Sequence, residues 1–114
     1  MKIAVTARGA GLGAWLDPVF EEARQLLVVD ESDRFTAWNT PPDSHDPEGE
    51  DRIRWLVDEG ANVLVTGRCS EKTYRRLREA GIRVLRGDEG AVLQVVEAAR
   101  RGELAPLDPG EEIR

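Results

Sequence analysis

The sequence predicts an α/β domain built on a mixed five-stranded sheet. Five short segments have the length of strands rather than helices, at residues 3–5, 26–29, 34–39, 63–65 and 82–85; most are apolar runs, and residues 34–39 alternate weakly. Between the first and second runs, the segment 15–23 is too short for a full crossover helix, and between the second and third only a polar turn is left. The last two alternate with helical patterns that end at a glycine. A hairpin-rich first half and a βα-repeating second half together predict a sheet that mixes antiparallel and parallel strands.

The first half of the chain is expected to form three strands. Residues 3–5 form a buried strand because they are wholly apolar and are followed by a glycine-containing loop. Residues 15–23 leave space for only one helical turn. The runs 26–29 and 34–39 flank a polar turn at residues 30–33, so they form a hairpin in which strand 2 is antiparallel.

The second half is expected to add two strands and about three helices. Asp46–Pro47 suits a helix start, with Asp as the N-cap and Pro at the first helical position, and Gly60 ends that helix. Ser70 caps a second helix that ends at Gly81, and a third helix covers residues 90–101. Right-handed crossovers place the fourth strand beside the first, which gives the order 3-2-1-4-5. This is the order of a ribonuclease-H-like three-layer fold.

The length of 114 residues fits one domain. We expect that domain to span residues 1–104. Residues 105–114 are rich in proline, glycine and glutamate, so they are expected to form a frayed C-terminal tail.

Charge and cysteine content limit the class of partner. The formal net charge is −6, from 22 acidic and 16 basic residues. Such a surface disfavours nucleic acid and anionic membranes, both of which attract basic proteins. No apolar run approaches the roughly 20 residues of a membrane span. A single cysteine excludes an intrachain disulfide and the start at Met1 shows no apolar leader, so a cytoplasmic protein is expected.

Several short motifs occur in an order that is typical of one protein family. Their residues are Met1–Val5, then Phe20, Ala23 and Asp30, then Leu56, Gly60, Val63, Leu64, Thr66 and Gly67, then Leu77, Ala80, Gly81, Ile82 and Val84, and finally Gly87, Gly90, Val92, Gly102 and Leu104. Over residues 1–104 the chain resembles the dinitrogenase iron–molybdenum cofactor biosynthesis family, which includes NifX-type proteins and the C-terminal domain of NifB. It departs from the family pattern where Glu21 follows Phe20 and where Arg68–Glu71 replaces a Gly-Pro pair.

The resemblance implies a ribonuclease-H-like fold and a non-catalytic role. The ligand it implies is an iron–sulfur or iron–molybdenum cluster precursor, bound transiently in exchange with a protein partner in cluster assembly. The protein would act as a monomer or a homodimer. The alternative is a metal-free module of the same fold that binds a small anion or another protein.

The candidate ligand site is the crevice at the carboxyl ends of strands one and four, the topological switch point of the predicted sheet. Two loops are expected to meet there, residues 8–13 and 67–70. Their glycines allow close approach, their arginines supply positive charge, and the helix start after the second loop favours an anion. The expected cofactor-binding residues are Arg8, Gly9, Gly11, Gly13, Gly67, Arg68 and Ser70.

Cys69 and His45 are the candidate metal ligands. Cys69 lies between Arg68 and the helix cap at Ser70, a position expected to lower the thiol pKa and expose a thiolate to iron or another soft metal. His45, the only histidine, lies in an Asp-containing loop and is a candidate second ligand. Each residue also has a structural interpretation, as a small buried side chain for Cys69 and as an ordinary surface side chain for His45.

The residues do not favour an enzyme. A ribonuclease-H-type nuclease needs an acid in its first strand, and residues 2–6 contain none. The spacing G-x-G-x-G at residues 9–13 differs from the dinucleotide fingerprint G-x-G-x-x-G. A hydrolase or transferase would need a nucleophile–base pair, whereas His45 and Cys69 lie on separate loops. We therefore expect no catalytic residues.

Overall fold

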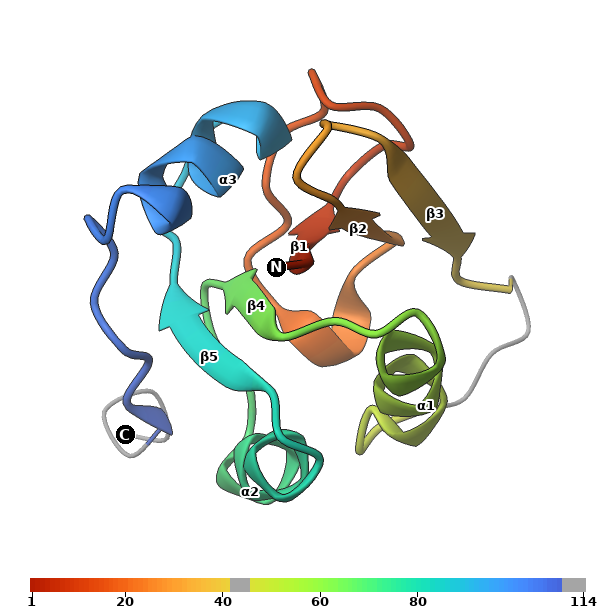
Figure 1. Ribbon diagram of the computed structural model, residues 1–114. Helices are drawn as coiled ribbons and strands as arrows, with labels where there is room; N and C mark the ends of the chain where they lie inside the picture. The colour runs from red at the N-terminus through yellow and green to blue at the C-terminus, as the bar shows by residue number, and fades with distance from the viewer. Residues whose placement is uncertain (42–45, 110–114) are drawn as a thin grey trace.

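The computed structural model describes residues 1–41 and 46–109 (Figure 1). Within these residues five strands, three α-helices and one 3-10 turn follow one another along the chain. In order they are β1 (Ile3–Ala7), η1 (Phe20–Glu22), β2 (Gln25–Val29), β3 (Phe35–Asn39), α1 (Glu50–Asp58), β4 (Val63–Thr66), α2 (Glu71–Glu79), β5 (Arg83–Arg86) and α3 (Val92–Arg100).

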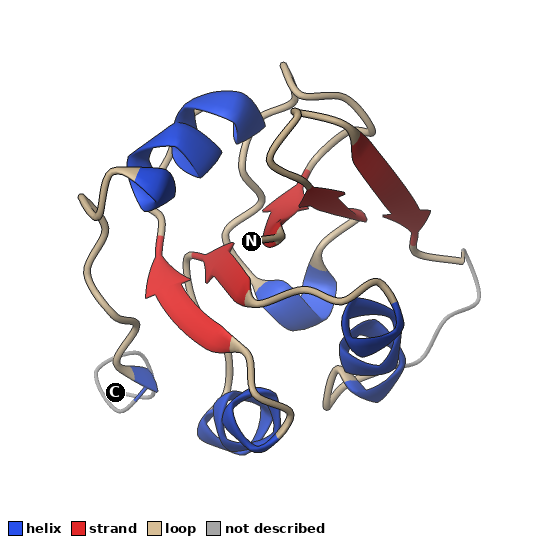
Figure 2. Cartoon of the chain, in the orientation of Figure 1, coloured by secondary structure: helices blue, strands red, loops and turns tan. Residues whose placement is uncertain are grey.

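The five strands form one mixed sheet in the order β3-β2-β1-β4-β5, which confirms the predicted topology (Figure 2). β2 is antiparallel to both of its neighbours, while β4 and β5 run parallel to β1. The register places Ile3 opposite Val29 on one side and opposite Val63 on the other. The carboxyl ends of β1, β4 and β5 therefore lie along the same edge of the sheet.

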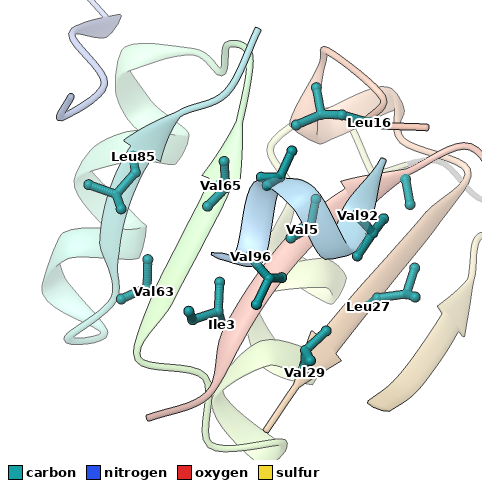
Figure 3. Packing of buried hydrophobic residues seen from close by; sticks show 12 residues of the cluster. Ile3, Val5, Leu16, Leu27, Val29, Val63, Val65, Leu85, Val92 and Val96 are labelled. Atoms are coloured by element: carbon teal, nitrogen blue, oxygen red, sulfur yellow. The ribbon is translucent and has the colours of Figure 1, made fainter. Parts of the chain in front are cut away.

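Helices cover both faces of the sheet, so β1 at its centre is buried along its whole length (Figure 1). α3 covers one face, where Val92 and Val96 pack on the strands together with Ile3, Val5 and other buried side chains (Figure 3). α1 and α2 cover the other face, over a second apolar cluster that includes Phe20, Leu56, Leu64 and Leu77. Burial of these two clusters supplies the main driving force for folding.

α1 begins at Glu50, so the predicted start at Asp46–Pro47 is wrong. Asp46 still serves the helix, because its carboxylate accepts hydrogen bonds from the backbone N–H groups of Asp51 and Arg52. The N-cap is Gly49, at φ +70°, and a Cβ there would lie 2.8 Å from the ring of Phe20. Close packing on Phe20 and a left-handed backbone thus place the helix start three residues later than the local signal.

The other helix signals agree with the structure. Ser70 is the N-cap of α2 and its Oγ accepts a hydrogen bond from Thr73 N at 3.1 Å, as predicted. Gly60 and Gly81 follow the ends of α1 and α2 with φ near +80°, the left-handed geometry typical of a glycine that ends a helix. Among the described residues, no helix has both the length and the apolar character needed to cross a bilayer.

The chain after α3 stays on the sheet, so the expectation of a frayed tail is wrong for its first residues. Arg86 N donates to Ala105 O at 2.8 Å, and Leu107 N donates to Val84 O at 3.0 Å. Leu107 is buried in the cluster under α1 and α2. These contacts extend the sheet beyond β5, because a buried leucine and two backbone bonds together hold the segment in place. Residues 110–114 lie outside the described residues.

Candidate functional site at the carboxyl edge of the sheet

The switch point between β1 and β4 is crossed by the chain itself. Asp17 N donates to Thr6 O at 2.9 Å, which ties residue 17 to the end of β1. Arg68 N then donates to Pro18 O at 2.8 Å and Phe20 N donates to Arg68 O at 3.0 Å, which ties the same segment to the loop after β4. Residues 17–20 therefore lie over the crevice that was expected to hold a ligand.

The glycine-containing loop after β1 accepts hydrogen bonds from the first turn of α3. Ala14 O accepts a hydrogen bond from Val92 N at 2.8 Å, and Leu12 O accepts one from Leu93 N at 3.0 Å. These are backbone N–H groups of the first helical turn, which have no partner within the helix. The loop satisfies them with its own carbonyl groups.

The predicted residues of this first loop are loosely packed. Arg8 is exposed, and a Cβ at Gly11 or Gly13 would meet nothing within 4 Å. A Cβ at Gly9 would contact only the side chain of Ala14. Gly11 and Gly13 of the first loop thus have open space around them, and the joining of this loop with Gly67, Arg68 and Ser70 in a single cradle stays a prediction.

An open hollow of about 260 Å³ lies at the carboxyl ends of β4 and β5. We call it the β4–β5 hollow; its lining residues are Pro18, Gly67, Arg68, Arg86, Gly87 and Asp88. Gly67 and Gly87 are tightly packed, since a Cβ at either position would come within 2.7 Å of another atom. Arg68 and Arg86 bring two guanidinium groups to this hollow, and Arg86 Nε donates to Asp88 Oδ1 at 3.1 Å.

Arg86 lines the β4–β5 hollow and is not among the residues that the sequence predicted for the site. It is the last residue of β5, which lies parallel to β4 with Arg86 opposite Thr66. Its position in the sequence could have marked it as a candidate, because ligands in open α/β sheets bind outside the carboxyl ends of the parallel strands.

A second hollow of about 290 Å³ lies on the other side of Arg68. We call it the Cys69 hollow; it is lined by Val19, Glu21, Glu22, Pro47, Arg68, Cys69 and Ser70. Glu21 Oε2 accepts a hydrogen bond from Ser70 N at 2.9 Å. The start of α2 therefore already has a carboxylate from its own chain beside it, where the sequence predicted an external anion.

Cys69 does not have the exposed, low-pKa thiol that the sequence predicted. Its side chain is 4% exposed and packs in the apolar cluster with Phe20 and Leu77. Burial raises the pKa of the Cys69 thiol to about 12, and the Glu21 carboxylate adds to the rise. Both effects disfavour a negative charge on sulfur, so the thiol stays protonated at neutral pH and is a poor metal ligand in this state.

The described residues contain no group of three or more His, Cys, Asp or Glu side chains placed to hold a metal ion. His45, the second candidate ligand, lies outside the described residues. The carboxyl edge presents Arg68, an exposed arginine that lines both hollows, and Arg86, whose guanidinium is ion-paired with Asp88. Arginine side chains suit an anion, to which their guanidinium groups donate charge-assisted hydrogen bonds.

Comparison with protein families gives a match over residues 1–102 to the family described as dinitrogenase iron–molybdenum cofactor. The chain belongs to this family. The match spans all five strands and α3, and it ends before the segment that pairs with β5. No curated protein matches the chain.

Solved structures share the fold over nearly the whole family domain. The apo form of the orange protein from Desulfovibrio gigas is 32% identical, with a TM-score of 0.84 over 95% of this chain and 93% of that one. A Thermotoga protein assigned as NifB is 26% identical, with a TM-score of 0.79 over 93% and 92%. A Methanocaldococcus jannaschii protein assigned as a dinitrogenase is 18% identical, with a TM-score of 0.69 over 96% of both chains, and shows the fold alone.

Proposed function

We propose that this protein is a small, non-catalytic domain that binds and carries an iron–sulfur or iron–molybdenum cluster precursor. The observation that supports it most is the family match over residues 1–102. The 32% identical relative was solved as an apo form, a description that implies a ligand-bound form of that protein. The cluster is the cargo of this domain, and it would pass between the protein and an assembly partner.

We place the cargo at the β4–β5 hollow, next to Arg68 and Arg86. A sulfide-bridged cluster precursor is an anion with acceptor sulfur atoms on its surface. Two guanidinium groups can hold such an anion by charge and hydrogen bonds, without forming a metal–protein bond. This mode of binding suits a buried, protonated Cys69. It also suits a carrier, because a ligand held by charge leaves more readily than one held by thiolates.

A metal-free anion-binding module remains the second candidate, and the same hollow supports it. Arg68 and Arg86 would hold a phosphate group by the contacts proposed for a cluster. The two functions differ in cargo, so metal uptake separates them. A module for small anions takes up no iron or sulfide, and phosphate stabilises it against heat.

The test is anaerobic incubation with iron and sulfide, with and without molybdate, followed by removal of unbound metal on a desalting column. We expect the wild type to keep a visible absorbance band and a fixed metal content. Arg68→Ala should lose most of both, because it removes a guanidinium from the hollow. Arg83→Ala is the matched control: it removes an exposed arginine at the opposite end of β5, so its uptake should equal that of the wild type.

Two further variants decide between modes of binding. Cys69→Ser should retain the cluster if the arginines hold it, whereas a loss confined to Cys69→Ser would restore thiolate ligation as the better account. His45→Ala tests the second predicted ligand in the same assay. Wild-type protein that retains no metal, but is stabilised by inorganic phosphate, would replace the carrier function with the anion-binding one.

A further inference from the structure

The two edge strands of the sheet, β5 and β3, differ in whether another segment of the chain pairs with their outer side. Beyond β5, residues 105–107 run alongside the strand and satisfy Arg86 N and Val84 O (Figure 1). β3 forms the opposite edge, and its only sheet neighbour among the described residues is β2. One edge is thus covered by the chain and the other is open in the part of the chain that the structure describes.

The pairing register identifies the backbone groups on the open side of β3. Thr40 N donates to Arg24 O at 2.9 Å, and the residues two and four positions earlier face β2 in the same way. Because backbone direction alternates along a strand, the N–H and C=O groups of Phe35, Ala37 and Asn39 point away from the sheet. Such a row of unpaired groups is a template for another strand.

β3 lacks the features by which proteins usually protect an open edge. Its five residues, Phe35–Asn39, include no charged side chain and no proline. Its pairing with β2 is regular over all five positions, with no bulge. Phe35 is 41% exposed. Charges, prolines and bulges are the common means of blocking strand addition, so within residues 1–41 and 46–109 nothing blocks this edge.

We propose that β3 pairs antiparallel with β3 of a second copy of this chain, which gives a two-fold symmetric dimer with one continuous sheet. The outward groups set the register. Ala37 lies opposite the partner's Ala37 on the two-fold axis, and Phe35 lies opposite the partner's Asn39. The unpaired N–H and C=O groups of each copy then satisfy those of the other.

The strand is complementary to itself, which favours a second copy as the occupant. On the face covered by α1 and α2, Thr36 would lie opposite the partner's Trp38, and pairs of a β-branched and an aromatic residue stabilise antiparallel strands. No like charges meet between residues 35 and 39. In a chain of net charge −6, this uncharged strand lets two copies approach without direct repulsion at the contact.

The covered edge at β5 determines what kind of assembly results. If both edges were open, β3 of one copy could pair with β5 of the next, and copies would add without limit. Residues 105–107 occupy the β5 edge, so only the β3 edge is available and association stops at two copies. Five paired residues span about 17 Å. A contact of that length buries much less surface area than a permanent interface does. The dimer is therefore weak and reversible.

Sedimentation velocity over a concentration series tests this surface. The wild type should shift from monomer to dimer as concentration rises. Ala37→Lys and Ala37→Glu each place like charges face to face on the two-fold axis, so each should raise the dissociation constant by about fivefold or more. An equimolar mixture of the two should recover dimerisation, because Lys then faces Glu. Ala37→Ser, which keeps the N–H group and adds no charge, is the matched control.

Hydrogen exchange on the wild type tests the same contact without a substitution. The amide of Ala37 points away from β2, so it should exchange freely in dilute solution and become protected as the dimer forms. A wild type that stays monomeric at every concentration overturns the proposal. So does a dimer that Ala37→Lys leaves unchanged, or one in which the Ala37 amide exchanges as fast as in the monomer.

Discussion

The loops after β1 and β4 look alike in sequence and differ in use. Each follows a strand that ends at the carboxyl edge, and each combines glycine with arginine, at residues 8–13 and 67–70. The first caps α3 with its carbonyl groups. The second forms backbone hydrogen bonds with residues 17–20 and lines two hollows. We propose that only the second loop takes part in ligand binding.

The difference lies in what surrounds each glycine. A Cβ at Gly67 would lie 2.7 Å from Pro18 O, whereas one at Gly11 or Gly13 would meet open space. A glycine in a strand-end loop therefore has more than one physical cause. At Gly67 it permits close backbone packing, which the sequence alone does not distinguish from room for a ligand.

The largest effect on this comparison is expected from Gly67→Ala. The new methyl group cannot fit beside Pro18 O, so either β4 or the segment 17–20 must shift. We expect a loss of about 3 kcal/mol in the free energy of unfolding, as for overpacked cores, measured by urea denaturation. Unchanged stability would mean that residues 17–20 are not held against β4, and the crevice between β1 and β4 would again be open to a ligand.

Cys69 gives the next effect, through pH. Its pKa is about 12 in the folded protein and near 9 when unfolded, so above pH 9 the unfolded chain loses a proton that the folded chain keeps. This contribution to stability is complete below pH 9 and is lost as the pH rises towards 12, by about 1.4 kcal/mol at about pH 10. Urea midpoints measured across this range should fall less steeply in Cys69→Ala than in the wild type.

Ser70→Ala should cost about 1 kcal/mol, because it removes the oxygen that accepts from Thr73 N at the start of α2. Ser70→Asp is the control that retains an acceptor at the cap. Chemical denaturation of both variants measures the difference. An equal loss in the two would point to Glu21, which binds Ser70 N, as the group that the substitutions disturb.

Gly13→Ala should have the smallest effect, within about 0.5 kcal/mol of the wild type. A Cβ there has no close neighbour and the backbone φ is not positive. Reduced entropy of the unfolded chain offsets part of any cost. Thermal and urea unfolding would check it, with Gly11→Ala as a parallel variant. A large loss in either variant would show that the first loop is as tightly packed as the second.

Local patterns accounted for most of the fold. The strand order, the hairpin of β2 and β3, the cap at Ser70 and the ends of α1 and α2 all agree with the prediction. These features depend on the period of side chains along a strand or helix and on backbone preferences of single residues. Both are properties of a few neighbouring residues, so they can be inferred without knowing what lies across the molecule.

The candidate site was predicted less well, because each of its errors involves residues far apart in the chain. Position alone suggested a reactive thiol at Cys69, but packing against Phe20 and Leu77 and the approach of Glu21 raise its pKa. Arg86 reaches the β4–β5 hollow only because β5 lies beside β4.

The sequence by itself therefore determined the family and the order of the strands. The tertiary structure alone decided that residues 17–20 cross the switch point, that Cys69 is buried and that residues 105–107 cover β5. The physical reason is the same in each case. Burial, pKa and close approach are set by distances between groups brought together by folding, and no local pattern encodes those distances.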